Sequence, residues 1–146
     1  MIELYTIGFT NKSAQRFFEL LEGGGVKQII DTRINNTSQL AGFAKGSDLA
    51  FFAGRVGGMA YQHDVDLAPT KELLERYRKK QLGWAEYELA YLNLLDMRNI
   101  RARFQPERFH QSCLLCSEHS PEQCHRRLLA EYLQQTNPAI RITHLM

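Results

Sequence analysis

The sequence predicts a three-layer α/β fold, in which a mostly parallel sheet of about five strands lies between helices. Short apolar runs rich in β-forming residues alternate along the chain with segments whose apolar residues recur at helical spacing. This alternation is the rhythm of β-α-β units, and short apolar strands favour a parallel sheet. The chain has 146 residues and no repeats, so we expect a single domain over residues 1–146.

Each expected element has a local signal. Ser13 is a good N-cap and three glycines from residue 23 end the first helix, while polar residues 32–47 form a loop that is long enough to suggest function. Asp48 is the expected cap of the second helix. The expected strands are residues 2–7, 26–30, 59–63, 112–116 and 140–145. The expected helices are residues 14–22, 49–55, 70–80, 84–97 and 121–135, with one more helical turn at 106–111.

The composition excludes several classes of protein. Hydrophobic residues make up 44% of the chain, and no apolar run approaches the roughly 20 residues of a membrane span. The first ten residues lack a basic segment and carry Glu3, so we expect no signal peptide. We therefore expect a cytoplasmic protein with no membrane partner, whose three cysteines are thiols or ligands rather than disulfides.

Basic residues gather in the middle of the chain, although the net charge of +2 indicates no particular partner. This pattern predicts either a solvated helical face or a surface that contacts phosphate groups. The residues are Arg76, Arg78, Lys79, Lys80, Arg98, Arg101, Arg103 and Arg108.

The cysteine-rich stretch near the C-terminus contains a well-specified helix start. The run SPEQ fits a capping box with Ser120 as N-cap, which predicts a helix from Pro121. At about 100° per residue, His125 falls near the centre of the buried face, and Cys124 and Arg126 fall on its two borders. The helix start would therefore direct an imidazole inward, with a thiol and a guanidinium beside it.

Polar residues follow four of the predicted strands, and the carboxyl ends of parallel strands meet at one edge of a sheet. Side chains alternate along strand 112–116, so Cys116 faces away from Cys113 and lies at the edge where open α/β sheets bind ligands. This convergence predicts a site. Besides the helix residues, its expected members are Gly8, Asn11, Asp31, Arg33, His63, Cys116 and Glu118.

Three kinds of site compete for these residues, and zinc is the first. Four candidate ligands are present, namely Cys113, Cys116, Cys124 and His125. The pattern disfavours zinc, because Cys113 and Cys116 point to opposite faces of a strand and because adjacent Cys and His residues in a helix rarely bind one ion. We therefore expect no metal and no cofactor, with a metal held by fewer of these groups as the minor alternative.

A nucleophilic thiol is the second alternative. A helix N-terminus, His125 and a nearby arginine would each lower the pKa of a cysteine. Cys116 and Cys124 are the candidate nucleophiles, and His125 would orient or deprotonate them while a carboxylate handles protons. The predicted catalytic residues are Asp31, Cys116, Glu118, Cys124 and His125.

An anion-binding module is the third alternative. Helix N-termini bind phosphate and carboxylate groups, and Arg33 and Arg126 could clamp such a ligand. The predicted ligand-binding residues are Gly8, Asn11, Arg33, His63 and Arg126.

Four motifs resemble the domain of unknown function 488 family of bacteria and archaea. They are TIGFTN at the first strand, DTR at the second, the block from NNTSQL to KELL, and LLCSEHSPEQCHRRLLAEYL. The family's usual first motif is Thr-Ile-Gly-His-Ser, and Phe9 stands here at the position of its histidine. The resemblance implies a compact α/β domain with a shared site, and it implies no particular reaction. The matched positions are Asp31, Arg33, Cys116, Glu118, Cys124, His125 and Arg126.

Our leading hypothesis is an enzyme that acts on a phosphate-bearing ligand, a nucleotide or nucleic acid, at the carboxyl ends of the strands. The competing hypothesis is a non-catalytic or regulatory module that binds nucleic acid through the same rim and the basic middle segment. Indifference of binding to the loss of the thiols would favour the module.

Overall fold

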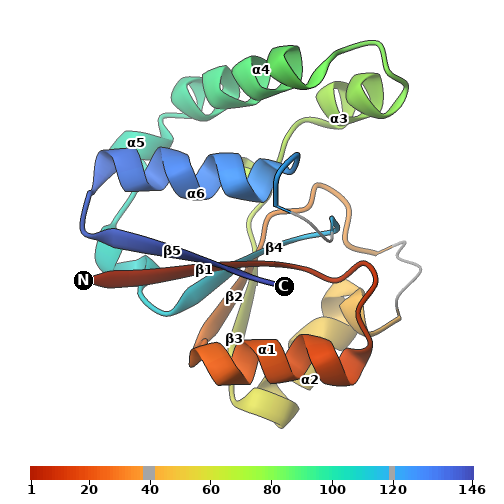
Figure 1. Cartoon of the computed structure of the whole chain (residues 1–146), viewed down its shortest axis with the longest axis vertical. Coiled ribbons are helices and arrows are strands. Elements are labelled where there is room, and N and C mark those ends of the chain that lie inside the picture. The colour runs from red at the N-terminus through yellow and green to blue at the C-terminus, as the bar shows by residue number, and fades with distance from the viewer. Residues whose placement is uncertain (38–41, 119–120) are drawn as a thin grey trace.

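A five-stranded parallel sheet lies between two layers of helices in this protein, as a computed structural model shows (Figure 1). The structure describes residues 1–37, 42–118 and 121–146. The strands are β1 (Ile2–Gly8), β2 (Gln28–Asp31), β3 (Ala60–His63), β4 (Ser112–Cys116) and β5 (Ile140–Leu145). The α-helices of the described residues are α1 (Ala14–Gly24), α2 (Gly46–Gly57), α3 (Lys71–Arg78), α4 (Trp84–Met97), α5 (Ile100–Arg103) and α6 (His125–Thr136). The predicted three-layer α/β fold is confirmed.

The sheet places β4 at its centre, with strand order β3-β2-β4-β1-β5 and parallel pairing throughout. The chain leaves β1 and β2 toward the face covered by α1 and α2, but it leaves β4 toward the face covered by α6 (Figure 1). Chain connections therefore diverge on both sides of the carboxyl end of β4. Such switch points are where open α/β sheets bind ligands.

Two hydrophobic cores sandwich the sheet. Leu114 of β4 faces the core beneath α4 and α6, whereas Cys113 and Leu115 face the core above α1 and α2. The predicted alternation of side chains along this strand is therefore confirmed. Each fully buried aliphatic side chain contributes about 1.5–3 kcal/mol of transfer free energy, so these layers fix the strand ends that carry the polar residues.

The first half of the chain follows the predicted elements with small shifts. Ser13 caps α1 as expected, since its hydroxyl accepts a hydrogen bond from the Arg16 backbone N–H at 3.1 Å. The prediction that Asp48 caps the second helix is wrong, because α2 begins at Gly46, whose N–H donates to the carbonyl of Asn36 at 2.8 Å. Asp48 lies instead in the first turn, where a carboxylate favours the helix dipole.

The predicted start of the last helix at Pro121 is also wrong, and the difference shapes the site. Helix α6 begins at His125, and Cys124 is its N-cap with an extended backbone (φ −135°, ψ 141°). The expected capping residue, Ser120, lies outside the described residues. An extended Cys124 interrupts any helix from Pro121 and turns its thiol toward the end of β4. The short helix α5 was not predicted.

In the part of the chain that the structure describes, no helix combines the length and the apolarity needed to cross a membrane.

Candidate functional site

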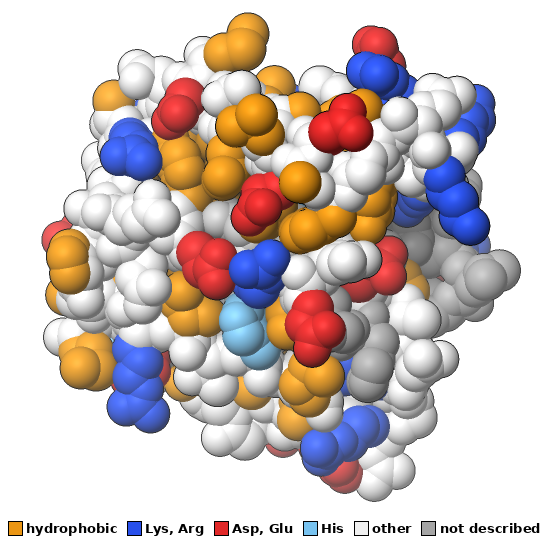
Figure 2. All heavy atoms as spheres, turned by 45° about the horizontal axis from the view of Figure 1, so that its top comes forward, with side chains coloured by type: hydrophobic (Ala, Val, Ile, Leu, Met, Phe, Trp, Pro, Cys, Tyr) orange, Lys and Arg blue, Asp and Glu red, His pale blue; other side chains and the backbone are white. Residues whose placement is uncertain are grey.

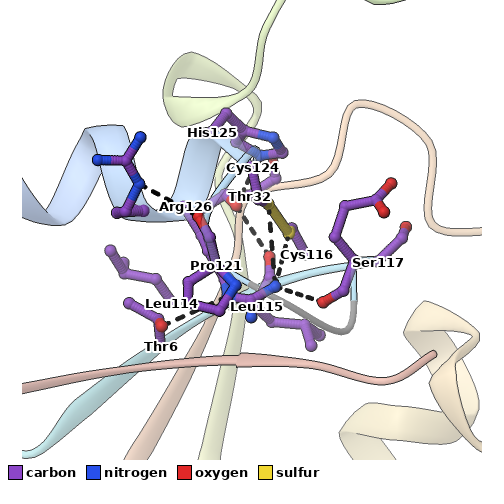
Figure 3. The surroundings of a disulfide bond; sticks show 12 residues. Thr6, Thr32, Leu114, Leu115, Cys116, Ser117, Pro121, Cys124, His125 and Arg126 are labelled. Atoms are coloured by element: carbon purple, nitrogen blue, oxygen red, sulfur yellow. Dashed lines mark hydrogen bonds between the residues drawn. A yellow bond between two sulfur atoms is a disulfide. The ribbon is translucent and has the colours of Figure 1, made fainter. Parts of the chain in front are cut away.

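A buried arginine ties together the elements that meet at the end of β4 (Figure 3). The Arg126 side chain is fully buried, although the sequence placed it at the border of the helix face. Its Nε donates to the Thr6 hydroxyl at 3.3 Å, and its Nη1 donates to the Glu118 carbonyl and to the Cys116 sulfur at 3.3 Å. The Cys124 sulfur lies 3.8 Å from the same nitrogen. One guanidinium therefore contacts β1, the end of β4, the following loop and the start of α6.

Cys116 and Cys124 bring their sulfur atoms into direct contact, and Figure 3 draws them as a disulfide. Cys116 is the last residue of β4, and Cys124 reaches it because its extended backbone lies outside the helix. The sequence predicted thiols or ligands rather than disulfides, and this prediction is wrong for Cys116 and Cys124, because the extended Cys124 brings its sulfur onto that of Cys116. Cys113 is a fully buried free cysteine on the opposite face of the sheet, and burial raises the pKa of its thiol. Cys116 and Cys124 are therefore the two cysteines that meet at the end of β4.

Arg126 sets the electrostatics around this pair. Burial lowers the pKa of its guanidinium to about 10, which leaves it cationic at neutral pH. A cation in contact with sulfur stabilises a thiolate, and so does the N-terminus of a helix of 12 residues, where Cys124 lies.

Gly8 leaves the space that the arginine needs. A Cβ atom at this position would collide with the Glu118 carbonyl and would lie 2.7 Å from Nη1 of Arg126. Gly8 thus permits the close approach of the loop and the guanidinium to the end of β1. It acts on the site through packing.

His125 is buried on the same side, as predicted. Its Nε2 lies 3.0 Å from both the carbonyl and the hydroxyl of Thr32, and its ring meets Tyr91 edge to face. Because the Thr32 hydroxyl donates to the Leu115 carbonyl at 2.8 Å and the Thr32 carbonyl only accepts, Nε2 carries the proton. Burial lowers the pKa of His125 to about 4, so the imidazole is neutral and its Nδ1 holds a lone pair. At neutral pH, Nδ1 can accept a hydrogen bond or a proton, and the predicted role of His125 as a base stays a prediction.

Asp31 and Arg33 form a buried ion pair at the end of β2. Arg33 donates from Nε and Nη2 to the two carboxylate oxygens at 2.8 and 2.7 Å, and Tyr61 donates its hydroxyl to the same carboxylate at 2.5 Å. Burial and this carboxylate raise the pKa of Tyr61 to about 12. Asp31 is therefore occupied in holding Arg33 in place.

One donor group of Arg33 is left unsatisfied by the surrounding protein. Its Nη1 is buried and has no hydrogen-bond partner among the described residues, while its guanidinium lies 5.3 Å from the centroid of the Phe9 ring. A buried N–H without a partner carries a desolvation cost of about 1–3 kcal/mol, which an anionic ligand would remove.

A cavity of about 510 Å³ opens over these residues. Cys116, Cys124 and His125 form part of its lining, and Arg33 and Glu118 lie beside them. The opposite wall comes from α3, the loop after it and α4. The described lining residues on that wall are Leu74, Tyr77, Arg78, Lys80, Leu82 and Tyr87.

Comparison with known families identifies the family of the chain. The model of the family described as Domain of unknown function DUF488 matches residues 13–133. The chain belongs to the DUF488 family. No curated protein and no solved structure matched the chain.

In this DUF488 protein, half of the ten predicted site residues line the cavity, and the other five are not among its described lining residues. Gly8, Asp31 and Arg126 support the lining from behind. His63 is exposed and its Nε2 lies 2.6 Å from the Arg33 carbonyl, and Asn11 is exposed in a turn with φ 61°. Neither of these two is among the described lining residues. The roles assigned to the ten residues stay predictions.

Sequence reasoning missed the tyrosines of the opposite wall. The rings of Tyr77 and Tyr87 pack in a tilted arrangement with their centroids 4.7 Å apart, and Trp84 stacks on Tyr87 at 5.5 Å. Their helical spacing indicated only a packed helix face. The basic run from Arg76 to Lys80 was the one signal that this segment carries polar contacts.

The pKa of His125 gives this DUF488 protein a specific dependence of stability on pH. Because the folded pKa is about 4 and the ordinary value is 6.5, the unfolded chain binds a proton between these pH values and the folded chain does not. The charged groups that act on His125 are Asp31, Arg126 and Arg78. We predict that the free energy of unfolding falls as pH drops from 6.5 to 4, by up to about 1.4 kcal/mol per pH unit from this residue.

Urea unfolding of the wild type and of His125→Gln across this pH range measures how much His125 contributes to the pH dependence of the free energy of unfolding. The glutamine amide can still donate to the Thr32 carbonyl, and all other titrating groups are common to both proteins. Equal slopes for the two proteins would contradict the prediction.

Proposed function

We propose that this DUF488 protein is an enzyme that acts on a phosphate-bearing, nucleotide-like ligand, with the Cys116–Cys124 pair as its reacting group. One observation carries the proposal. A single cavity is lined by two cysteines, a neutral histidine, three cationic residues and two tyrosines. Cavities of about 300–1,000 Å³ commonly hold small molecules and cofactors, and the volume here is about 510 Å³.

The cations support a phosphate group in the ligand. Arg78 and Lys80 are exposed at the cavity wall, and Arg33 is a third cationic residue of the lining. Arginine forms paired hydrogen bonds with phosphate oxygens, and charge-assisted hydrogen bonds are about twice as strong as neutral ones. Glu118 lies on the same wall, so the ligand also presents a donor such as a ribose hydroxyl or a base N–H to it.

The tyrosines support an aromatic ring in the ligand. Tyr87 is almost fully buried, and Tyr77 covers it and is half-buried. Nucleobases stack on aromatic side chains at a gain of about 1–3 kcal/mol per base. A base on Tyr77 would place its phosphate within the reach of the neighbouring Arg78.

The chemistry of the site is covalent thiol chemistry. In the reduced protein, a thiolate held by Arg126 donates an electron pair to an electrophilic atom of the ligand, and the bond from that atom to the leaving group breaks. The leaving group takes a proton from solvent. Water then cleaves the new bond to sulfur and releases a proton to solvent, so that the thiolate is regenerated.

A disulfide between Cys116 and Cys124 removes both nucleophiles, so activity requires a reductant. We therefore place the reaction in the cytoplasm, where thiols stay reduced.

A non-catalytic module that binds nucleic acid is the second candidate, and the surface over α3 favours it. The basic side chains Arg76, Arg78, Lys79 and Lys80 are all exposed, and Figure 2 shows Lys and Arg side chains gathered at the edge of the molecule on this side. Such a surface contacts phosphate groups without reading sequence.

Replacing either cysteine distinguishes the enzyme hypothesis from the hypothesis of a non-catalytic binding module. We predict that Cys116→Ser and Cys124→Ser each lower kcat by at least about 100-fold for the active member of a panel of nucleoside mono-, di- and triphosphates, while ligand binding persists. The reason is that the serine hydroxyl is not ionised at neutral pH. Product formation by mass spectrometry and binding by calorimetry, with reductant present, measure both quantities.

Cys113→Ala is the matched control for these variants and keeps activity. The enzyme proposal fails if no panel member is converted while short single-stranded oligonucleotides bind in a salt-dependent way and both serine variants bind as the wild type does.

The cations of the opposite wall provide a second prediction. Arg78→Ala and Lys80→Ala each weaken nucleotide binding by about 5–10-fold, because each loses one charge-assisted contact of about 1–1.4 kcal/mol. Lys79→Ala is the matched control, since Lys79 is exposed between them but is not among the described lining residues. Equal losses in all three variants would indicate a diffuse basic surface and would contradict binding in the cavity.

A further inference from the structure

We propose that the reduced protein binds one soft divalent metal ion, of the zinc class, through the sulfur atoms of Cys116 and Cys124 and a ring nitrogen of His125. The ligand atoms of these three residues all lie within 4.8 Å of one another, and all three side chains are buried. The proposal goes beyond the function proposed above and does not depend on it.

The late start of α6 makes this arrangement feasible. If Cys124 and His125 were both inside a helix, their side chains would diverge by about 100°. Cys124 instead has an extended backbone and His125 is the first helical residue, so the two adjacent side chains converge. The objection that the sequence raised against zinc therefore does not apply to these two residues.

The spacing of the two cysteine backbones fits shared coordination. Their Cα atoms are 7.7 Å apart. After reduction the two sulfurs can separate, and this backbone spacing leaves room for both to bind one tetrahedral ion at about 2.3 Å. Cys113 takes no part, because it lies in the core on the opposite face of the sheet.

The surroundings of the three ligands are those of a metal site. The Thr32 carbonyl accepts the proton of His125 Nε2 at 3.0 Å, which orients the ring and leaves Nδ1 as the free donor atom. Metal-binding histidines usually give their other N–H to such a partner. The Arg126 N–H groups lie 3.3 and 3.8 Å from the two sulfurs, where they stabilise thiolate ligands.

Three protein ligands leave one position of a tetrahedral ion open. Cys116, Cys124 and His125 all line the cavity, so the open position faces the space proposed for the ligand. Each thiol gives its proton to solvent as the ion binds, and no electrons are exchanged. A thiolate that binds the ion is not free to react, so metal and alkylating reagents compete for the same sulfurs.

Titration of the reduced full-length protein with Co²⁺ under anaerobic conditions tests the proposal. We expect one ion per chain, with thiolate-to-cobalt charge-transfer absorption that Zn²⁺ abolishes by displacement. The absorption should disappear in Cys116→Ser and Cys124→Ser and persist in Cys113→Ala. His125→Gln should weaken binding by at least about 10-fold.

Protection from alkylation provides a readout that needs no variant. One equivalent of Zn²⁺ should slow the alkylation of Cys116 and Cys124 in the native wild type. Absence of the charge-transfer band in the wild type, or its persistence in both serine variants, would overturn the proposal. Neither outcome bears on nucleotide binding at Arg78 and Lys80, so failure of the metal site and failure of the proposed function are distinguishable.

Discussion

The burial of the Arg126 guanidinium is the interaction on which the site depends. Removing such a charge from water costs several kcal/mol, and the cost is offset only where the surroundings supply well-placed acceptors. Thr6, the Glu118 carbonyl and the two sulfurs supply them from four different parts of the chain. The same contacts that satisfy the arginine therefore fix the end of β4, the loop after it and the first residue of α6. The contacts of Arg126 therefore determine both the stability of the site and its electrostatics.

The two arginines of the site have different tasks because they are held differently. Arg126 lies behind the sulfurs and is fully buried, so its charge acts on the thiols. Arg33 is held by Asp31 in a buried ion pair, so much of its charge is balanced by that carboxylate. The topology of the sheet makes this division feasible, because the connections diverge around β4 and leave its end open.

The strands and the convergence of polar residues could be predicted from the sequence, since both follow from local periodicity and from the geometry of parallel sheets. The bounds of β4 and β5 agree with the structure for this reason. The start of α6 could not be predicted, because SPEQ has a strong local capping signal while a long-range contact of Cys124 with β4 decides its backbone. Local rules also placed Arg126 at a border, whereas its partners come from β1 and β4.

The opposite wall of the cavity shows a second limit. Tyr77 and Tyr87 line the cavity only because α3 and α4 fold back over the end of β4, and helical spacing cannot distinguish a cavity wall from a packed face. Similarly, the pairing of Arg33 with Asp31 could be foreseen from their spacing, but the unpartnered Nη1 depends on the packing of the surrounding side chains.

The central claim is that Arg126 holds a thiolate at the cavity. The most direct measurement is the alkylation rate of each cysteine at neutral pH, mapped by mass spectrometry on the reduced, chelator-treated native protein, with the unfolded chain as the reference. We predict that Cys116 or Cys124 reacts faster in the native protein than in the unfolded chain, while Cys113 stays unreactive until the protein unfolds. If all three cysteines are inert until unfolding, the pair has only a packing role and the claim is contradicted.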